Sequence, residues 1–138
     1  MEENMENANL ADERGLKAKI RRFFAQEFFR NSLIHWTAIA AIFLNLANWV
    51  FLAIFVHPVN YELILHYNVY FGIDITRPWW EAYLIPTVGS ILLLVNFLLA
   101  YHFYDQKERV ASYLLLLTSI MAQAGLIIAS VAVVIVNY

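Results

Sequence analysis

Residues 57–81, HPVNYELILHYNVYFGIDITRPWWE, are the one long stretch of this chain that is neither a charged tail, a short turn nor an apolar helix. From Leu63 to Ile75 every odd position is apolar or aromatic, and the even positions are polar or Gly except Ile64 and Tyr70. Side chains alternate between the two faces of a strand, so this pattern predicts an extended segment. Its many β-branched and aromatic residues are also typical of strands.

A weaker helical interpretation remains open, because four residues of the stretch also recur at helical spacing. They are Leu63, Tyr67, Tyr70 and Asp74.

An extended stretch needs partners for its backbone, because a lone strand leaves rows of N–H and C=O groups unpaired. It either folds back on itself, around Tyr67-Asn68 or at Gly72, or pairs with a strand of a partner protein. We expect self-folding in the isolated protein and partner pairing in its function. The residues predicted for partner recognition, on the polar face, are His66, Asn68 and Asp74.

The composition predicts a membrane protein of one domain. Of the 138 residues, 62% are hydrophobic and 14% are charged, and the mean hydropathy is +0.59. The hydrophobic share and the mean hydropathy exceed what a soluble domain carries, and the charged share is lower than usual. Without cysteine the chain has no disulfide framework and no thiolate metal site. The basic residues adjoin an apolar segment and form no separate basic domain, so nucleic-acid binding is not expected.

Three apolar segments are long enough to cross a bilayer: 34–56, 82–104 and 111–136. At about 1.5 Å per residue the first reaches about 34 Å, and the hydrocarbon core is about 30 Å thick. The expected fold class is an all-α membrane protein with three transmembrane helices and a short extended, outward segment between the first two.

Each predicted span has a stripe of small or polar residues at spacings of three and four, which favours close packing in a left-handed bundle. The first stripe is Ala38, Ala41, Asn45, Asn48 and Leu52, and the second is Pro86, Gly89, Leu93, Asn96 and Ala100. The third is Thr118, Ala122, Gly125, Ala129 and Ala132.

The N-terminal residues change sign along their length. Residues 1–13 are polar and acidic, which predicts a disordered tail. Residues 14–33 are basic, with apolar residues on one helix face, which predicts an amphipathic interfacial helix that attracts anionic lipid head groups. The alternative is a plain positive flank to the first span. Eight of the nine basic residues precede the first span or follow the second, so the N-terminus is expected in the cytoplasm and the C-terminus outside.

Four amide side chains lie deep in the predicted spans: Asn45, Asn48, Asn96 and Gln123. They are expected to hold the helices together through interhelical hydrogen bonds. The alternative is a polar site for a transported solute. Transport sites usually recruit an ionisable group, and no such group lies deep in any span, so packing is the favoured interpretation.

Four titratable residues of the outward segment contain ligand types suitable for zinc: His57, Glu62, His66 and Asp74. Their spacing matches no compact metal motif, and no phosphate loop, nucleophile elbow or dinucleotide fingerprint occurs in the chain. We therefore expect neither a catalytic site, nor a metal, nor a cofactor.

One family resemblance accompanies these patterns. The run Leu65 to Asp74, followed by Trp79, Pro86, Gly89 and Asn96, resembles a family of small uncharacterised bacterial three-span integral membrane proteins. The resemblance covers roughly residues 57–137. It implies a bacterial cytoplasmic (inner) membrane setting and no particular activity.

Together these patterns favour a non-catalytic multi-pass membrane protein, a subunit or accessory factor of an envelope assembly that meets other membrane proteins or itself. A component of an oligomeric transporter or channel is the first alternative. A metal-dependent membrane enzyme is the second.

Overall fold

The computed structural model describes residues 27–68, 70 and 72–137, and for residues 66–68, 73 and 74 it describes the backbone alone. The predicted acidic tail, 1–13, lies outside the described residues. So does the predicted amphipathic helix, 14–33, except for its last seven positions.

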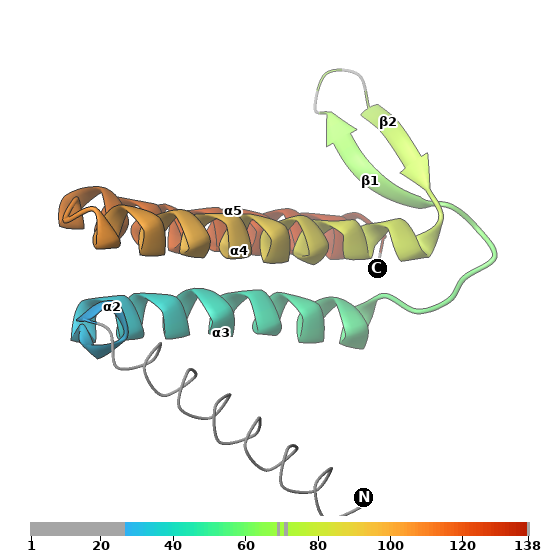
Figure 1. The fold of residues 1–138 in the computed structure, drawn as a ribbon. Coiled ribbons are helices and arrows are strands. Elements are labelled where there is room, and N and C mark those ends of the chain that lie inside the picture. Colours follow the sequence, from blue (N-terminus) through green and yellow to red (C-terminus); the bar gives the residue numbers. More distant parts are fainter. Residues whose placement is uncertain (1–26, 69, 71, 138) are drawn as a thin grey trace, which may run out of the picture.

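Three long helices form the body of the molecule, as Figure 1 shows: α3 (Ser32–Phe55), α4 (Leu84–Asp105) and α5 (Arg109–Asn137). At about 1.5 Å per residue they measure about 36, 33 and 44 Å. Each is long and apolar enough to cross a membrane. The prediction of three long apolar helices is confirmed, with ends within two residues of the expected ones. The left-handed crossing of the bundle stays a prediction.

The start of α3 is set by Asn31. This residue follows a four-residue helix, α2 (Glu27–Arg30), and its backbone is extended. Its side-chain oxygen accepts a hydrogen bond from the Leu33 N–H at 3.0 Å, a typical N-cap that satisfies one of the first free donors of a helix. The helix therefore begins at Ser32 rather than at residue 34. It ends at Phe55, shortly before Pro58.

The second long helix is preceded by a short 3-10 helix, η1 (Trp79–Tyr83). Pro86 lies in the first turn of α4, where a missing N–H costs least. At the other end, Lys107 adopts a left-handed backbone with φ of 68°. Its N–H donates to the Tyr104 carbonyl at 3.0 Å. This hydrogen bond ends α4, and α5 begins at Arg109. The polar residues 106–108 between the two helices therefore form a tight turn.

Helix α5 packs along both α3 and α4, whereas α3 and α4 touch each other much less. The predicted small-residue stripe of α5 is wrong for packing within this chain: Thr118, Gly125, Ala129 and Ala132 are exposed. The buried face of α5 is mostly polar instead. Its buried members are Ser112, Leu116, Ser119, Gln123, Ser130, Val133 and Val134. The stripes predicted for the other two helices are buried or half-buried.

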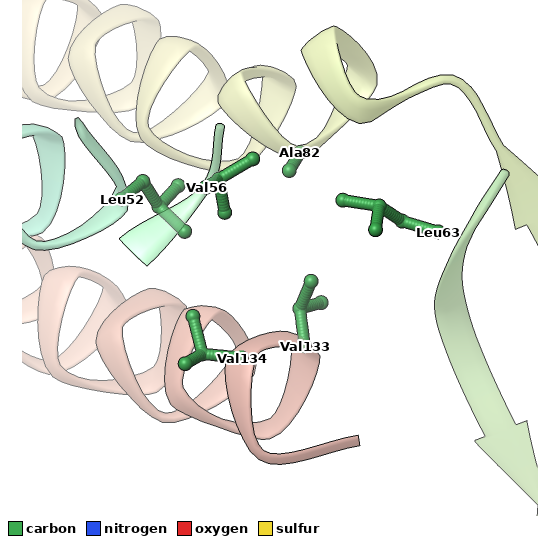
Figure 2. Packing of buried hydrophobic residues seen from close by; sticks show 6 residues of the cluster. All are labelled: Leu52, Val56, Leu63, Ala82, Val133 and Val134. Atoms are coloured by element: carbon green, nitrogen blue, oxygen red, sulfur yellow. The ribbon is translucent and has the colours of Figure 1, made fainter. Parts of the chain in front are cut away.

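Two apolar clusters close the two ends of the bundle. Figure 2 shows the first, in which side chains from α3, β1, η1 and α5 converge: Leu52, Val56, Leu63, Ala82, Val133 and Val134. The second joins α2 to the opposite end and consists of Phe28, Ile34, Ala100, Tyr104 and Leu116. Apolar side chains therefore fill the interior of the bundle at its two ends, and polar side chains are buried between the two clusters.

Within the stretch 57–81, the chain forms an antiparallel hairpin of β1 (Leu63–Asn68) and β2 (Gly72–Arg77). It projects sideways from the end of the bundle where α3 ends and α4 begins (Figure 1). Gly72 has a φ of 82°, a conformation that suits glycine in a turn. The extended, self-folded interpretation is confirmed, and the helical one is wrong.

The predicted apolar face does not persist through the hairpin. Leu63 is fully buried, but Ile75 is 45% exposed. Counting odd positions treats the stretch as one continuous strand, whereas the chain reverses and has two register shifts between Ile64 and Tyr67. Each shift moves the following residues relative to the faces of the sheet.

The last residue of α5 anchors the hairpin. The Asn137 amide accepts a hydrogen bond from the Ile64 N–H at 2.8 Å and donates one to the Ile64 carbonyl at 2.8 Å. It thus pairs with β1 as a neighbouring strand would. In this way the end of α5 covers the outer edge of β1.

Candidate functional site

Asn45 is the central residue of a polar layer halfway along the bundle. It is only 5% exposed, so its amide has to find partners inside the protein. Its Nδ2 donates to the Pro86 carbonyl and to Gln123 Oε1, both at 3.1 Å. One side chain of α3 therefore binds both other long helices.

Gln123 and Gly89 make the contact between α5 and α4. Gln123 is fully buried, and its Nε2 donates to the Gly89 carbonyl at 2.7 Å. A Cβ atom at residue 89 would lie 2.7 Å from Gln123 Oε1 and 2.8 Å from Asn45 Nδ2. Only glycine leaves room for both amides, which explains why the helices approach here.

Ser90 and Trp49 complete the layer. The Ser90 hydroxyl lies 2.9 Å from Asn45 Oδ1 and 2.9 Å from the Pro86 carbonyl. It accepts a hydrogen bond from Trp49 Nε1 at 3.3 Å. Every side-chain amide group of Asn45 and Gln123 thus has a partner within the protein. The prediction of buried amides did not include Ser90 and Trp49, although the position of Ser90 beside Gly89 was a usable signal.

Asn96 belongs to a separate contact. Its Nδ2 donates to the Ser119 hydroxyl at 3.1 Å, and that hydroxyl donates to the Leu115 carbonyl at 3.1 Å. Ser119 lies one turn before Gln123 on α5. The structure therefore brings together Asn45 and Gln123 and leaves Asn96 in a second layer one turn away.

Asn48 differs from the other amides. It is 1% exposed, and neither Nδ2 nor Oδ1 has a hydrogen-bond partner among the described residues. The Ser112 and Ser130 hydroxyls are buried in the same way. An unpaired buried polar group costs about 1–3 kcal/mol. Asn48 is therefore a destabilising residue in this arrangement of the helices.

The residues predicted for partner recognition all lie in the hairpin. His66 pairs with Ile75 across the ladder, and Asn68 pairs with Gly72. Asp74 is the extra residue of β2 at one of the register shifts. Their side chains lie outside what the structure describes, so no contact between them is assigned.

Residues 57–81 also contain the side chains that were considered as zinc ligands. His57 and Glu62 are exposed, and Glu62 Oε2 accepts a hydrogen bond from the Thr76 hydroxyl at 2.5 Å. No three His, Asp or Glu side chains gather as a metal site in the part of the chain that the structure describes.

The polar layer can cross-link helices, and its described residues include no group that ionises near neutral pH. Amides, a hydroxyl and an indole supply hydrogen bonds, but neither an activated nucleophile nor a general base. No protein-family model matches the chain, and no curated protein or solved structure matches it either. The geometry of the site therefore carries the functional argument.

Proposed function

We propose that this protein is a non-catalytic small integral membrane protein that serves as a subunit or accessory factor of a bacterial envelope assembly. The observation that carries the proposal is the polar layer, in which Asn45 binds both Gln123 and Ser90, and all three bind the α4 backbone. A layer satisfied in this way locks three helices together and offers no free group to a solute. Recognition then belongs to the outer surfaces.

The proposed topology follows the basic residues. The N-terminus and the turn between α4 and α5 lie in the cytoplasm, and the hairpin and C-terminus lie outside. The bacterial inner membrane as the setting rests on the family resemblance of residues 57–137.

The edge of β2 that faces away from β1 is the proposed contact with a partner. The N–H and C=O of Ile64 face Asn137, away from β2. In an antiparallel ladder, the N–H and C=O groups of two opposite residues either both face the other strand or both face away from it. Thr76 lies opposite Ile64, so its N–H and C=O face away from β1. An extended segment of another envelope protein would extend the sheet there.

Thr76→Pro tests this edge, because it removes one outward N–H. Thr76→Val is the matched control, since it removes the hydroxyl and keeps the N–H. Each protein is gently crosslinked in membranes and purified in mild detergent. The unaltered chain and Thr76→Val are expected to retain the same partner. Thr76→Pro is expected to lose that partner while its thermal stability stays unchanged. Equal retention by all three would contradict edge pairing.

A transporter or channel component is the second candidate, and Asn48 favours it. A fully buried amide without a partner among the described residues is the kind of group that a polar solute would satisfy in another arrangement of the helices. Flux of small ions and solutes into liposomes tests this candidate. Flux that disappears in Asn48→Leu, with the fold intact, would replace the accessory role by transport.

A further inference from the structure

The end of the bundle where α3 and α5 begin carries a cluster that the polar layer does not involve. We name it the basic end, and its cations are Arg30, Lys107 and Arg109. Two adjoining cavities open there. One of about 620 Å³ is lined by Glu27, Phe28, Tyr101, Tyr104, Asp105, Lys107 and Arg109. The other, of about 420 Å³, is lined by Glu27, Arg30, Asn31, Tyr104 and Arg109.

Arg109 lines both cavities and is held in place from two sides. Its Nη2 lies 3.1 Å from Glu27 Oε2, and its guanidinium stacks over the Tyr104 ring at 5.5 Å. Both side chains of this ion pair are exposed, and the planar fork of the guanidinium suits phosphate oxygens.

The smaller cavity has further donors. Asn31 Nδ2 donates to the Tyr104 hydroxyl at 3.3 Å, which leaves the hydroxyl hydrogen of Tyr104 for another acceptor. Among the described residues, Arg30 and Lys107 have no ion pair. Over both cavities the lining holds three cations and two carboxylates, so its net charge favours an anion.

The surroundings fit a lipid better than a soluble anion. The larger cavity is lined by Phe28 and Tyr101, whose rings meet edge to face with centroids 5.4 Å apart, and the Phe97 ring lies 5.5 Å from that of Phe28. In the membrane setting proposed above, this aromatic group lies at the depth where a bilayer changes from head groups to acyl chains. The N-terminus of α5 adds positive potential at the same level.

We propose that the basic end binds the phosphodiester head group of an anionic phospholipid, with Arg109 at the phosphate, Arg30 and Lys107 at the two adjoining cavities, and the acyl chains beside Tyr101. This inference rests on the membrane insertion proposed above and adds a defined lipid site, in which Arg30 of the basic segment 14–33 acts together with Lys107 and with Arg109 at the start of α5. Glu27 competes with the phosphate for Arg109.

Lipid retention measured by native mass spectrometry tests the site. The full chain is incubated in mild detergent with phosphatidylglycerol and phosphatidylcholine at equal concentration. The unaltered protein is expected to retain one phosphatidylglycerol preferentially. The double variant Arg30→Gln, Lys107→Gln should bind it more than tenfold more weakly, since each cation near a membrane surface contributes roughly a fivefold effect.

Two further variants distinguish binding at a defined site from a general attraction of anionic lipid to positive charge. Arg77→Gln removes one positive charge at the opposite end, where Arg77 lies 3.8 Å from Glu81, and should leave retention unchanged. Glu27→Gln should tighten phosphatidylglycerol binding several-fold, because it frees Arg109.

The site is overturned if the double variant retains phosphatidylglycerol as the unaltered chain does, or if Arg77→Gln loses as much. It is also overturned if Glu27→Gln weakens binding, or if glycerol 3-phosphate, at the lipid's own concentration, displaces the lipid. Retention in detergent does not depend on which way the chain crosses a membrane. A reversed topology would therefore overturn the proposed orientation and leave the lipid site intact.

Discussion

At the scale of single residues, the two described glycines of the helices differ in the space around them and can be compared directly. Gly89 faces Gln123, Asn45 and Leu126, each less than 3.0 Å from the position of an added Cβ. Gly125 has nothing within 4 Å of that position. Both lie inside long helices, where alanine is intrinsically better than glycine by about 1 kcal/mol.

Gly89→Ala and Gly125→Ala are therefore expected to have opposite effects. Overpacking at residue 89 should lower the free energy of unfolding by about 1–3 kcal/mol, and the change at residue 125 should raise it slightly. Thermal unfolding in one detergent compares them directly. A Gly89→Ala protein as stable as Gly125→Ala would show that the helices do not meet at the polar layer.

The buried amides give a second pair. Asn45 makes three hydrogen bonds, each contributing about 0.6 kcal/mol between membrane helices, so Asn45→Leu should destabilise by about 2 kcal/mol. Asn48→Leu should stabilise by about 1 kcal/mol or more, because it removes an amide without partners. The same melting experiment measures both. If Asn48→Leu is the more damaging change, Asn48 has a partner that the described residues do not supply.

At the scale of elements, Asn137 fastens β1 to α5 through the two hydrogen bonds to Ile64. Asn137→Ala should release the hairpin and leave the helices packed, because those bonds contribute about 1 kcal/mol each. Hydrogen exchange is expected to rise in residues 63–77 only. Asn60→Ala, at an exposed position, is the control. Faster exchange along α5 would mean that Asn137 supports the bundle itself.

Long periodic patterns were sufficient to predict the elements. Long apolar runs predicted the three helices, and the alternation of apolar and polar residues predicted the extended stretch. Each of these patterns extends over many residues, so single exceptions do not obscure it. The register shifts of the hairpin were not predictable, since alternation along a strand does not say which residues pair across the ladder. The anchoring role of Asn137 is equally a product of tertiary contact.

The face of a membrane helix is harder to predict than its length. On α5, the size of the residues favoured a stripe through Thr118 and Gly125, but the polar groups decided the packing. Gln123 and Ser119 find hydrogen-bond partners on the other helices, and a polar group without a partner is costly in an apolar surrounding. The predicted amides do not act as one group. Asn45 binds Gln123, whereas Asn96 binds Ser119, and Asn48 has no partner among the described residues.

At the scale of the whole molecule, the central claim is a three-span chain with the N-terminus and the α4–α5 turn on one side and the hairpin on the other. The chain has no cysteine, so single cysteines report position without interference. Asn60 and Gln106 are exposed at opposite ends of the bundle and carry no charge. Replacing them leaves the basic residues that set the topology unchanged.

The most direct test labels Asn60→Cys and Gln106→Cys in intact bacterial cells with a membrane-impermeant maleimide. The account predicts that residue 60 reacts in intact cells and that residue 106 reacts only after the cells are opened. Labelling of residue 106 alone in intact cells, or of both residues from the same side, would contradict it.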